Sequence, residues 1–207
     1  MIQNMRTARG FERLVNFSDA VVAIALTLLV LPLVEIPAEV THSQSLGDVF
    51  SDHGSLIGSF ALSFLVIWSL WSTHHRTMEY FHRYDSALVR FHLVWLFTIV
   101  SLPFTTQLLN TSSRIDGAVP LYIGTLLVSS IALFLMSWWG RRHPALLKNE
   151  LEGVKEWADE PASYVTVGSL LLALVLSLVI PALGAWPLLV LLLDDPIERV
   201  IERLRKR

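Results

Sequence analysis

An arginine, a serine and an aspartate lie close together where the first long apolar segment begins. Residues 13–37 read RLVNFSDAVVAIALTLLVLPLVEIP, so Arg13 precedes the apolar run and Ser18 and Asp19 lie just inside it. A charged side chain within a membrane is costly, and it normally faces the protein interior with a partner. Arg13 and Asp19 are too far apart on a straight helix to form an i,i+4 pair. We therefore expect Asp19 to point at another helix.

Candidate partners follow the second apolar segment, in the stretch WSTHHR that contains Trp71, His74 and His75. Imidazole and carboxylate side chains can also bind zinc or iron. His75 and Glu79 are spaced i,i+4, but the H-E-x-x-H pattern of zinc enzymes is missing. A polar packing network or a solvated loop is therefore favoured over a metal centre, and we expect no resident metal and no cofactor.

The apolar residues of the same segment form one stripe. At 100° per residue, Leu28 and Leu31 each project within about 40° of Ile24. Thr27 projects about 60° to one side of Ile24, and Asp19 about 140° away from it. Such a stripe is more often part of a protein core than the lining of a pore. Helical geometry alone leaves both interpretations open.

Two further features of this segment also have more than one interpretation. The Thr27 hydroxyl can bond back to a carbonyl of its own helix, or it can line a path for ions. Pro32 has no N–H to donate to the carbonyl of Leu28. This predicts at least a kink, and it leaves a carbonyl oxygen that can coordinate a cation.

The composition is that of a membrane protein. The chain has 207 residues, of which 53% are hydrophobic and 16% charged, and its mean hydropathy is +0.54. A membrane-spanning helix needs about 20 mostly apolar residues. We predict an all-α membrane protein in one domain, residues 1–207, with six transmembrane helices. The predicted segments are residues 14–36, 55–73, 88–109, 119–139 and 163–180, a short sixth within 182–193, and an amphipathic tail over about 195–207.

The basic residues indicate an orientation. The four regions that six spans leave on one side hold 3, 2, 4 and 5 Lys or Arg residues, and Arg90 lies just inside the third span at the same end. Only Arg114 of the 16 falls on the other side. Cytoplasmic loops carry the excess of Lys and Arg. We therefore expect both termini in the cytoplasm and the protein in the cell membrane, with the tail contacting anionic lipid headgroups.

Several function classes find no support in the sequence. We find no nucleophile elbow, phosphate-binding glycine loop or nucleic-acid-binding motif, so neither an enzyme nor a nucleic-acid partner is expected. The chain also lacks the T-V-G-Y-G filter of ordinary potassium channels. Cysteine is absent, which excludes disulfides.

The segment at Arg13 resembles a known family. RLVNFSD has the pattern R-x-x-x-F-S-D found in the transmembrane protein 175 family of potassium channels, and it is followed by TLLVLP. The resemblance extends to WSTHHR at residues 71–76, RYD at 83–85 and LPF at 102–104, whereas the last third matches by layout alone.

This resemblance implies a cation channel permeable to potassium and other monovalent cations. Because the chain carries one six-span repeat, it implies a homotetramer whose first helices surround the pore. It places a hydrophobic constriction at Ile24, Leu28 and Leu31 and a selectivity-determining hydroxyl layer at Thr27. A network that anchors the pore helix would then comprise Arg13, Phe17, Ser18 and Asp19 of the first span, and Trp71, His74 and His75 after the second.

Two other functions compete with the channel. A secondary transporter would use Asp19 and the histidines as coupling sites, but the prolines at 32, 103 and 181 show no pairing between two halves of the chain. A membrane metalloenzyme would need a bound metal.

Overall fold

The computed structural model describes residues 8–39, 45–110, 116–148, 154, 157 and 165–180. In these parts the chain is helical, apart from one isolated bridge between Phe81 and Leu147. The helices are α1 (Ala8–Leu28), α2 (Leu31–Val34), α3 (Ile36–Glu39), α4 (Leu46–Glu79), α5 (Ser86–Asn110), α6 (Ala118–Arg142) and α8 (Val165–Val179), with a 3-10 turn at Pro144–Leu146.

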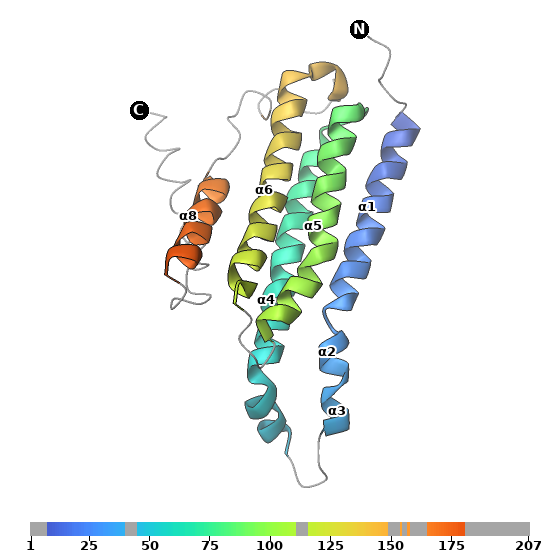
Figure 1. Cartoon of the computed structure of the whole chain (residues 1–207). Helices are drawn as coiled ribbons and strands as arrows, with labels where there is room; N and C mark the ends of the chain where they lie inside the picture. The colour runs from blue at the N-terminus through green and yellow to red at the C-terminus, as the bar shows by residue number, and fades with distance from the viewer. Residues whose placement is uncertain are drawn as a thin grey trace, which may run out of the picture.

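The long helices run side by side in an elongated bundle, with α1 at one side and α8 at the other (Figure 1). Helix α5 is central, because it packs against α1, α4 and α6. The main contacts of α8 are with α6. Side chains of α5 fill the middle of the bundle. Leu88, Trp95, Ile99 and Leu102 are fully buried.

Four helices are long and apolar enough to cross a membrane, and α8 is a shorter apolar helix. The all-α membrane architecture is therefore confirmed, and the first four predicted spans coincide with these long helices. The fifth predicted span, residues 163–180, coincides with α8. The predicted sixth span and the amphipathic tail lie outside the described residues, so the number six stays a prediction.

Helices α4, α5 and α6 are longer than the apolar segments that predicted them. Helix α4 begins at Leu46, because the Ser45 side chain accepts a bond from the Asp48 backbone and the Asp48 carboxylate accepts one from the Ser45 N–H at 2.8 Å. This capping box satisfies backbone donors at the helix start. At the other end α4 continues through the histidines to Glu79, where a polar run had suggested that the span ends. Hydropathy marks the stretch that fits a bilayer and not the length of the helix.

The first predicted span is broken and not merely kinked. Helix α1 ends at Leu28, Leu29 and Val30 form a turn, and α2 starts at Leu31 with Pro32 in its first turn. Proline cannot continue the hydrogen bonding of the preceding turn, but it is well tolerated at the start of a new helix. By contrast, Pro103 lies inside α5, which stays helical throughout.

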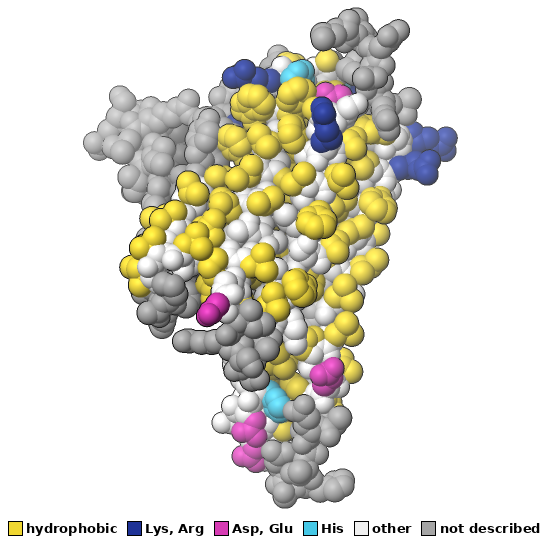
Figure 2. Space-filling view, in the orientation of Figure 1, with side chains coloured by type: hydrophobic (Ala, Val, Ile, Leu, Met, Phe, Trp, Pro, Cys, Tyr) yellow, Lys and Arg dark blue, Asp and Glu magenta, His cyan; other side chains and the backbone are white. Residues whose placement is uncertain are grey.

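The charged side chains are distributed unevenly along the bundle. On the visible face, Lys and Arg gather at the end where α1 starts, and most Asp and Glu side chains lie toward the opposite end (Figure 2). Apolar side chains cover the length between them. This is the surface expected of a protein that crosses a membrane.

Candidate functional site

Helix α1 has one face that packs into the subunit. Ser18, Val22 and Ala25 are exposed by only 0%, 2% and 1%, and they recur at the i, i+4, i+7 spacing of a single helical face. This face meets α5 and α4. Ser18, a polar residue near the start of the apolar run, is therefore among the best buried residues of the helix.

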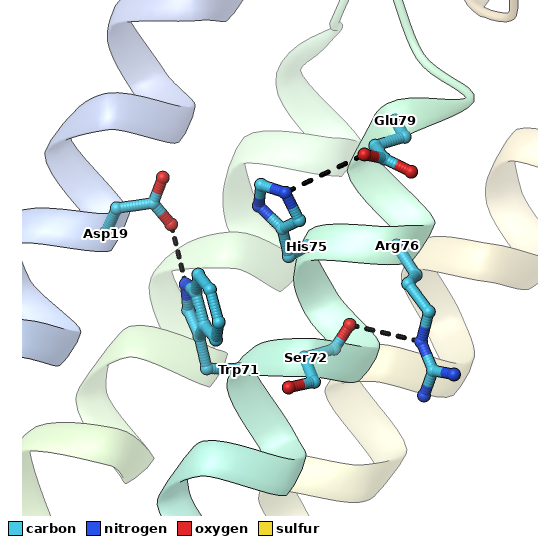
Figure 3. Close-up of polar contacts among 6 residues, drawn as sticks. All are labelled: Asp19, Trp71, Ser72, His75, Arg76 and Glu79. Carbon is cyan, nitrogen blue, oxygen red and sulfur yellow. Dashed lines mark hydrogen bonds and ion pairs between the residues drawn. The ribbon is translucent and has the colours of Figure 1, made fainter.

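Asp19 lies at the edge of this face and is bound by a neighbouring helix. The indole Nε1–H of Trp71 donates to Oδ1 of Asp19 at 2.8 Å, which joins α1 to α4 (Figure 3). The indole also lies against His75, with ring centroids 5.1 Å apart, and His75 Nε2 is 3.7 Å from Glu79 Oε1. A line of polar contacts thus leads from Asp19 along α4 to an exposed carboxylate.

Ser18 forms a second link, to α5. Its Oγ donates to the Leu14 carbonyl at 2.8 Å and lies 2.5 Å from Nε2 of His92. Since the hydroxyl proton is used on the Leu14 carbonyl, the imidazole is the donor in the second bond and carries its proton on Nε2. Sequence reasoning missed His92. The available signal was a histidine near the start of the mostly apolar segment 88–109.

His74 belongs to the same region but does not reach Asp19. It stacks on Trp95 with ring centroids 4.0 Å apart and meets His92 edge-on at 4.6 Å. Both His74 and His92 are buried. Among the described residues neither ring nitrogen of His74 has a hydrogen-bond partner, so it serves here as a packing group between α4 and α5.

The opposite face of α1 is uncovered. Phe17 and Ile24 are 59% and 60% exposed, and Leu28 is 40% exposed. Leu31, after the break, is 56% exposed. Ile24 and Leu28 therefore lie on the side of α1 away from the face that binds α4 and α5, and Leu31 is exposed on α2, after the break.

Two residues predicted for the anchoring network lie on this uncovered side. Arg13 is exposed, and Phe17 points away from the buried face that carries Ser18. The structure thus brings together Ser18, Asp19 and Trp71 with their neighbours on α4 and α5, whereas Arg13 and Phe17 stand apart from those contacts.

Thr27 is also exposed. Its hydroxyl donates to the Ile24 carbonyl at 2.7 Å, three residues earlier in the helix. The bond uses the proton of the hydroxyl and leaves its oxygen lone pairs available as acceptors. Oxygen lone pairs are what a potassium ion needs from a ligand.

No metal centre is found in the part of the chain that the structure describes, since no three His, Cys, Asp or Glu side chains are placed to hold an ion there. His75 and Glu79, the pair considered as metal ligands from the sequence, contact each other with Nε2 and Oε1 3.7 Å apart.

Comparison with known proteins places this geometry in context. The family model described as "Endosomal/lysosomal potassium channel TMEM175" matches residues 13–103, which begin at the arginine of the R-x-x-x-F-S-D pattern and end within α5. The matched part contains both the buried and the uncovered face of α1.

Individual relatives agree with the family model. A potassium channel of Streptomyces collinus is 34% identical over 133 residues, which cover 61% of this chain and 62% of that protein. A potassium channel of Chamaesiphon minutus is 34% identical over 128 residues, covering 58% of this chain and 60% of the relative.

The endosomal/lysosomal proton channel TMEM175 of Danio rerio is 25% identical over 148 residues, which cover 70% of this chain but only 28% of that protein. The chain thus spans less than two thirds of each of these relatives. The motif, the long apolar helices and these matches agree, and over residues 13–103 the chain is similar to the TMEM175 family of channels.

Proposed function

We propose that this chain is one subunit of a homotetrameric, potassium-permeable cation channel whose pore is lined by the uncovered face of α1 and α2. One observation carries the proposal. The exposed side chains Ile24, Leu28 and Leu31 share one stripe, while the opposite face of the same helix is held inside the subunit. Potassium permeation is named for relatives in Streptomyces and Chamaesiphon.

Four copies of this stripe around an axis would form stacked apolar rings. A narrow apolar constriction closes a channel by dewetting, without any plug. Thr27 would add a ring of hydroxyl oxygens beside these apolar rings. The chain has no T-V-G-Y-G filter whose carbonyl oxygens could bind the ion. Between Ile24 and Leu31, the Thr27 hydroxyl oxygens would replace part of the hydration shell of the ion.

The contacts of the buried face would then hold the pore helix in position. The Trp71 indole binds Asp19 from α4, and His92 binds Ser18 from α5, so two helices fix the rotation of α1. Networks of this kind rigidify a protein when their members are satisfied. The pore face would be set by the polar contacts behind it.

We also propose that the end of the bundle where α1 starts faces the cytoplasm, because Lys and Arg gather there. The chain has no cysteine, so single cysteines can be labelled without background. Cysteine at Leu46, which is 79% exposed, should react with an impermeant reagent from outside. Cysteine at the exposed Ala145 should react only after the membrane is opened. The reverse pattern would invert the topology.

Recording from the full-length protein in planar bilayers tests the channel itself. With potassium on one side and sodium on the other, we expect single-channel steps and a reversal potential displaced toward the potassium equilibrium potential. Native mass spectrometry should give four copies per particle. A reversal potential at zero would refute potassium preference, and solute-coupled ion flux without unitary steps would identify a transporter instead.

A further inference from the structure

We propose that the pore face of α1 extends past Ile24 to the start of the helix, so that Arg13 lies in the inner mouth of the pore and controls the entry of cations electrostatically. This inference rests on the proposed channel function and goes beyond it. The ligand class concerned is the permeant monovalent cation on its way in from the cytoplasmic side.

Helical geometry places Arg13 on this face. At 100° per residue, Arg13 and Phe17 each project within about 20° of Ile24, on opposite sides of it. Helix α1 is continuous from Ala8 to Leu28, so the spacing is not interrupted between these residues. Arg13, Phe17 and Ile24 therefore form one line along the helix.

The packing agrees with the geometry. Arg13 is exposed, and Phe17 is 59% exposed, close to the 60% of Ile24. Residues on the far side of the same turns are buried, among them Phe11 at 7% and Ser18 at 0%. The side of α1 that α4 and α5 leave uncovered thus runs the whole length of the helix, and not only along the apolar stripe.

The charge on this face is not neutralised by the acidic residues of the helix. Glu12 and Asp19 project about 120° and 140° away from Ile24, on the same flank of α1. Asp19 accepts the bond from Trp71, and Glu12 lines a cleft with His75 and Glu79 of α4. Among the described residues no ion pair to Arg13 is found. Arg9, one turn closer to the N-terminus, adds a second cation about 60° from the Ile24 line.

Four guanidinium groups around an axis create a positive potential at the mouth. A like-charged ring lowers the local concentration of cations and slows their entry from that side. Entry from the opposite side is affected less. Current leaving the cell should therefore be smaller than current entering it at equal and opposite voltage, and this asymmetry should weaken in high salt because the Debye length falls from about 30 Å at 0.01 M to about 3 Å at 1 M.

The first test compares Arg13→Gln with wild type in symmetric potassium, at low and at high salt. At low salt we expect the ratio of outward to inward current to rise about threefold in Arg13→Gln, with little difference at high salt. Arg13→Lys should behave like wild type. Arg142→Gln is the matched control, because Arg142 lies over the Trp138 ring on α6, at the same end of the bundle. A conducting Arg13→Gln channel with the wild-type ratio at low salt would overturn the inference.

A second test works in channels that keep Arg13. A cationic thiosulfonate reagent applied from inside to Phe17→Cys should reduce outward current, and an anionic reagent should increase it. Glu12→Cys, in the same part of α1 but turned toward the cleft, should react with no change in the current ratio. If the current through Phe17→Cys channels changes with neither reagent, the inference is overturned. This test also decides the case in which Arg13→Gln fails to assemble, a result that would favour an anchoring role for Arg13.

The two proposals fail in different ways. A wild-type protein that passes no ions would refute the channel. The other outcome is that wild type conducts and Ile24→Asn changes the current, but modification of Phe17→Cys does not. This outcome would support the channel and refute only the extension of its pore face to Arg13.

Discussion

The two faces of α1 differ in the contacts that their side chains make. On one face each polar group has a partner inside the subunit, since Ser18 binds His92 and Asp19 binds Trp71. On the other face, Phe17 and Ile24 are more than half exposed, and no part of the subunit that the structure describes covers them. In a membrane such a face meets lipid, another subunit or a water-filled path, and the presence of Arg13 and Thr27 on it disfavours lipid.

The comparison shows why exposure alone does not identify a pore. Leu93 and Phe97 on α5 are 67% and 73% exposed, more than Ile24, and apolar residues of this kind suit a lipid-facing surface. In the channel that we propose, the polar contacts on the back of α1 fix the rotation of the helix and therefore the direction of the uncovered face. Substitutions on the buried face of α1 should therefore change stability, and substitutions on its uncovered face should change current.

The largest effect is expected from Asp19→Ala. The substitution removes the acceptor of the Trp71 indole and leaves a part-buried N–H without its partner. Leaving such a donor unsatisfied costs about 1–3 kcal/mol. We expect a lower thermal midpoint of the purified oligomer and fewer assembled channels, measured by size-exclusion chromatography after heating.

The ion preference of the channels that do assemble should be unchanged in Asp19→Ala, because Asp19 projects away from the pore face. Asn16→Ala, at an exposed position in the preceding turn, is the control and should leave the thermal midpoint in place. A stable Asp19→Ala channel with an altered permeability ratio would put Asp19 in the ion path.

Ser18→Ala tests the second contact of the same face. It removes the partner of the His92 imidazole but adds no bulk, so the loss is that of one buried hydrogen bond, about 1–2 kcal/mol. Because the Ser18 hydroxyl is a neutral group, whereas the Trp71 indole donates to a carboxylate, the effect should be smaller than that of Asp19→Ala. Thermal midpoints of both variants in the same detergent give the order. Equal stability of Ser18→Ala and wild type would show that the Ser18–His92 contact does not hold the helix.

Much of the first helix could be predicted from its sequence. A carboxylate inside an apolar run needs a partner, and the stretch 71–76 at the matching height contained the Trp71 that the structure places on Asp19. The stripe of Ile24, Leu28 and Leu31 follows from helical periodicity alone. The Asp19–Trp71 contact could be predicted because it depends on a general cost of burying charge, whereas the stripe stays a prediction.

Other features depended on packing between helices and could not be predicted. That His92 reaches Ser18 is decided by the rotation of α5 against α1, which a single apolar segment does not encode. His74, next to His75 in sequence, is turned about 100° from it on the helix and meets Trp95 and His92 instead of Asp19. From the sequence we predicted a kink and not the break after Leu28, because Pro32 is compatible with a kinked helix and with two separate helices.

On the front face, Ile24→Asn should have the clearest effect on current. An amide in the narrowest apolar ring attracts water and opposes dewetting, so the closed state is destabilised. We expect open probability to rise about tenfold in bilayer recordings, with weaker discrimination between potassium and sodium. Val22→Thr, on the buried face of the same helix, is the control and should not raise the current. Unchanged current in both Ile24→Asn and Leu28→Asn would remove α1 from the pore.

The smallest effect is expected from Thr27→Val, which keeps the shape of the side chain and removes only the hydroxyl. The Ile24 carbonyl loses a bond that an exposed helix can replace with water, so assembly and current should persist. What disappears is the ring of oxygen acceptors beside the apolar constriction. The permeability ratio of potassium to sodium should therefore fall about two- to fivefold, read from bi-ionic reversal potentials in the same lipid as wild type. Thr27→Ser, which keeps the hydroxyl, should retain the wild-type ratio.

Because Thr27 projects about 60° from Ile24, its hydroxyl reaches the axis fully only if α1 rotates on opening. A Thr27→Val channel with the wild-type permeability ratio would show that the hydroxyl stays on the flank of the helix and that selectivity comes from the apolar rings alone.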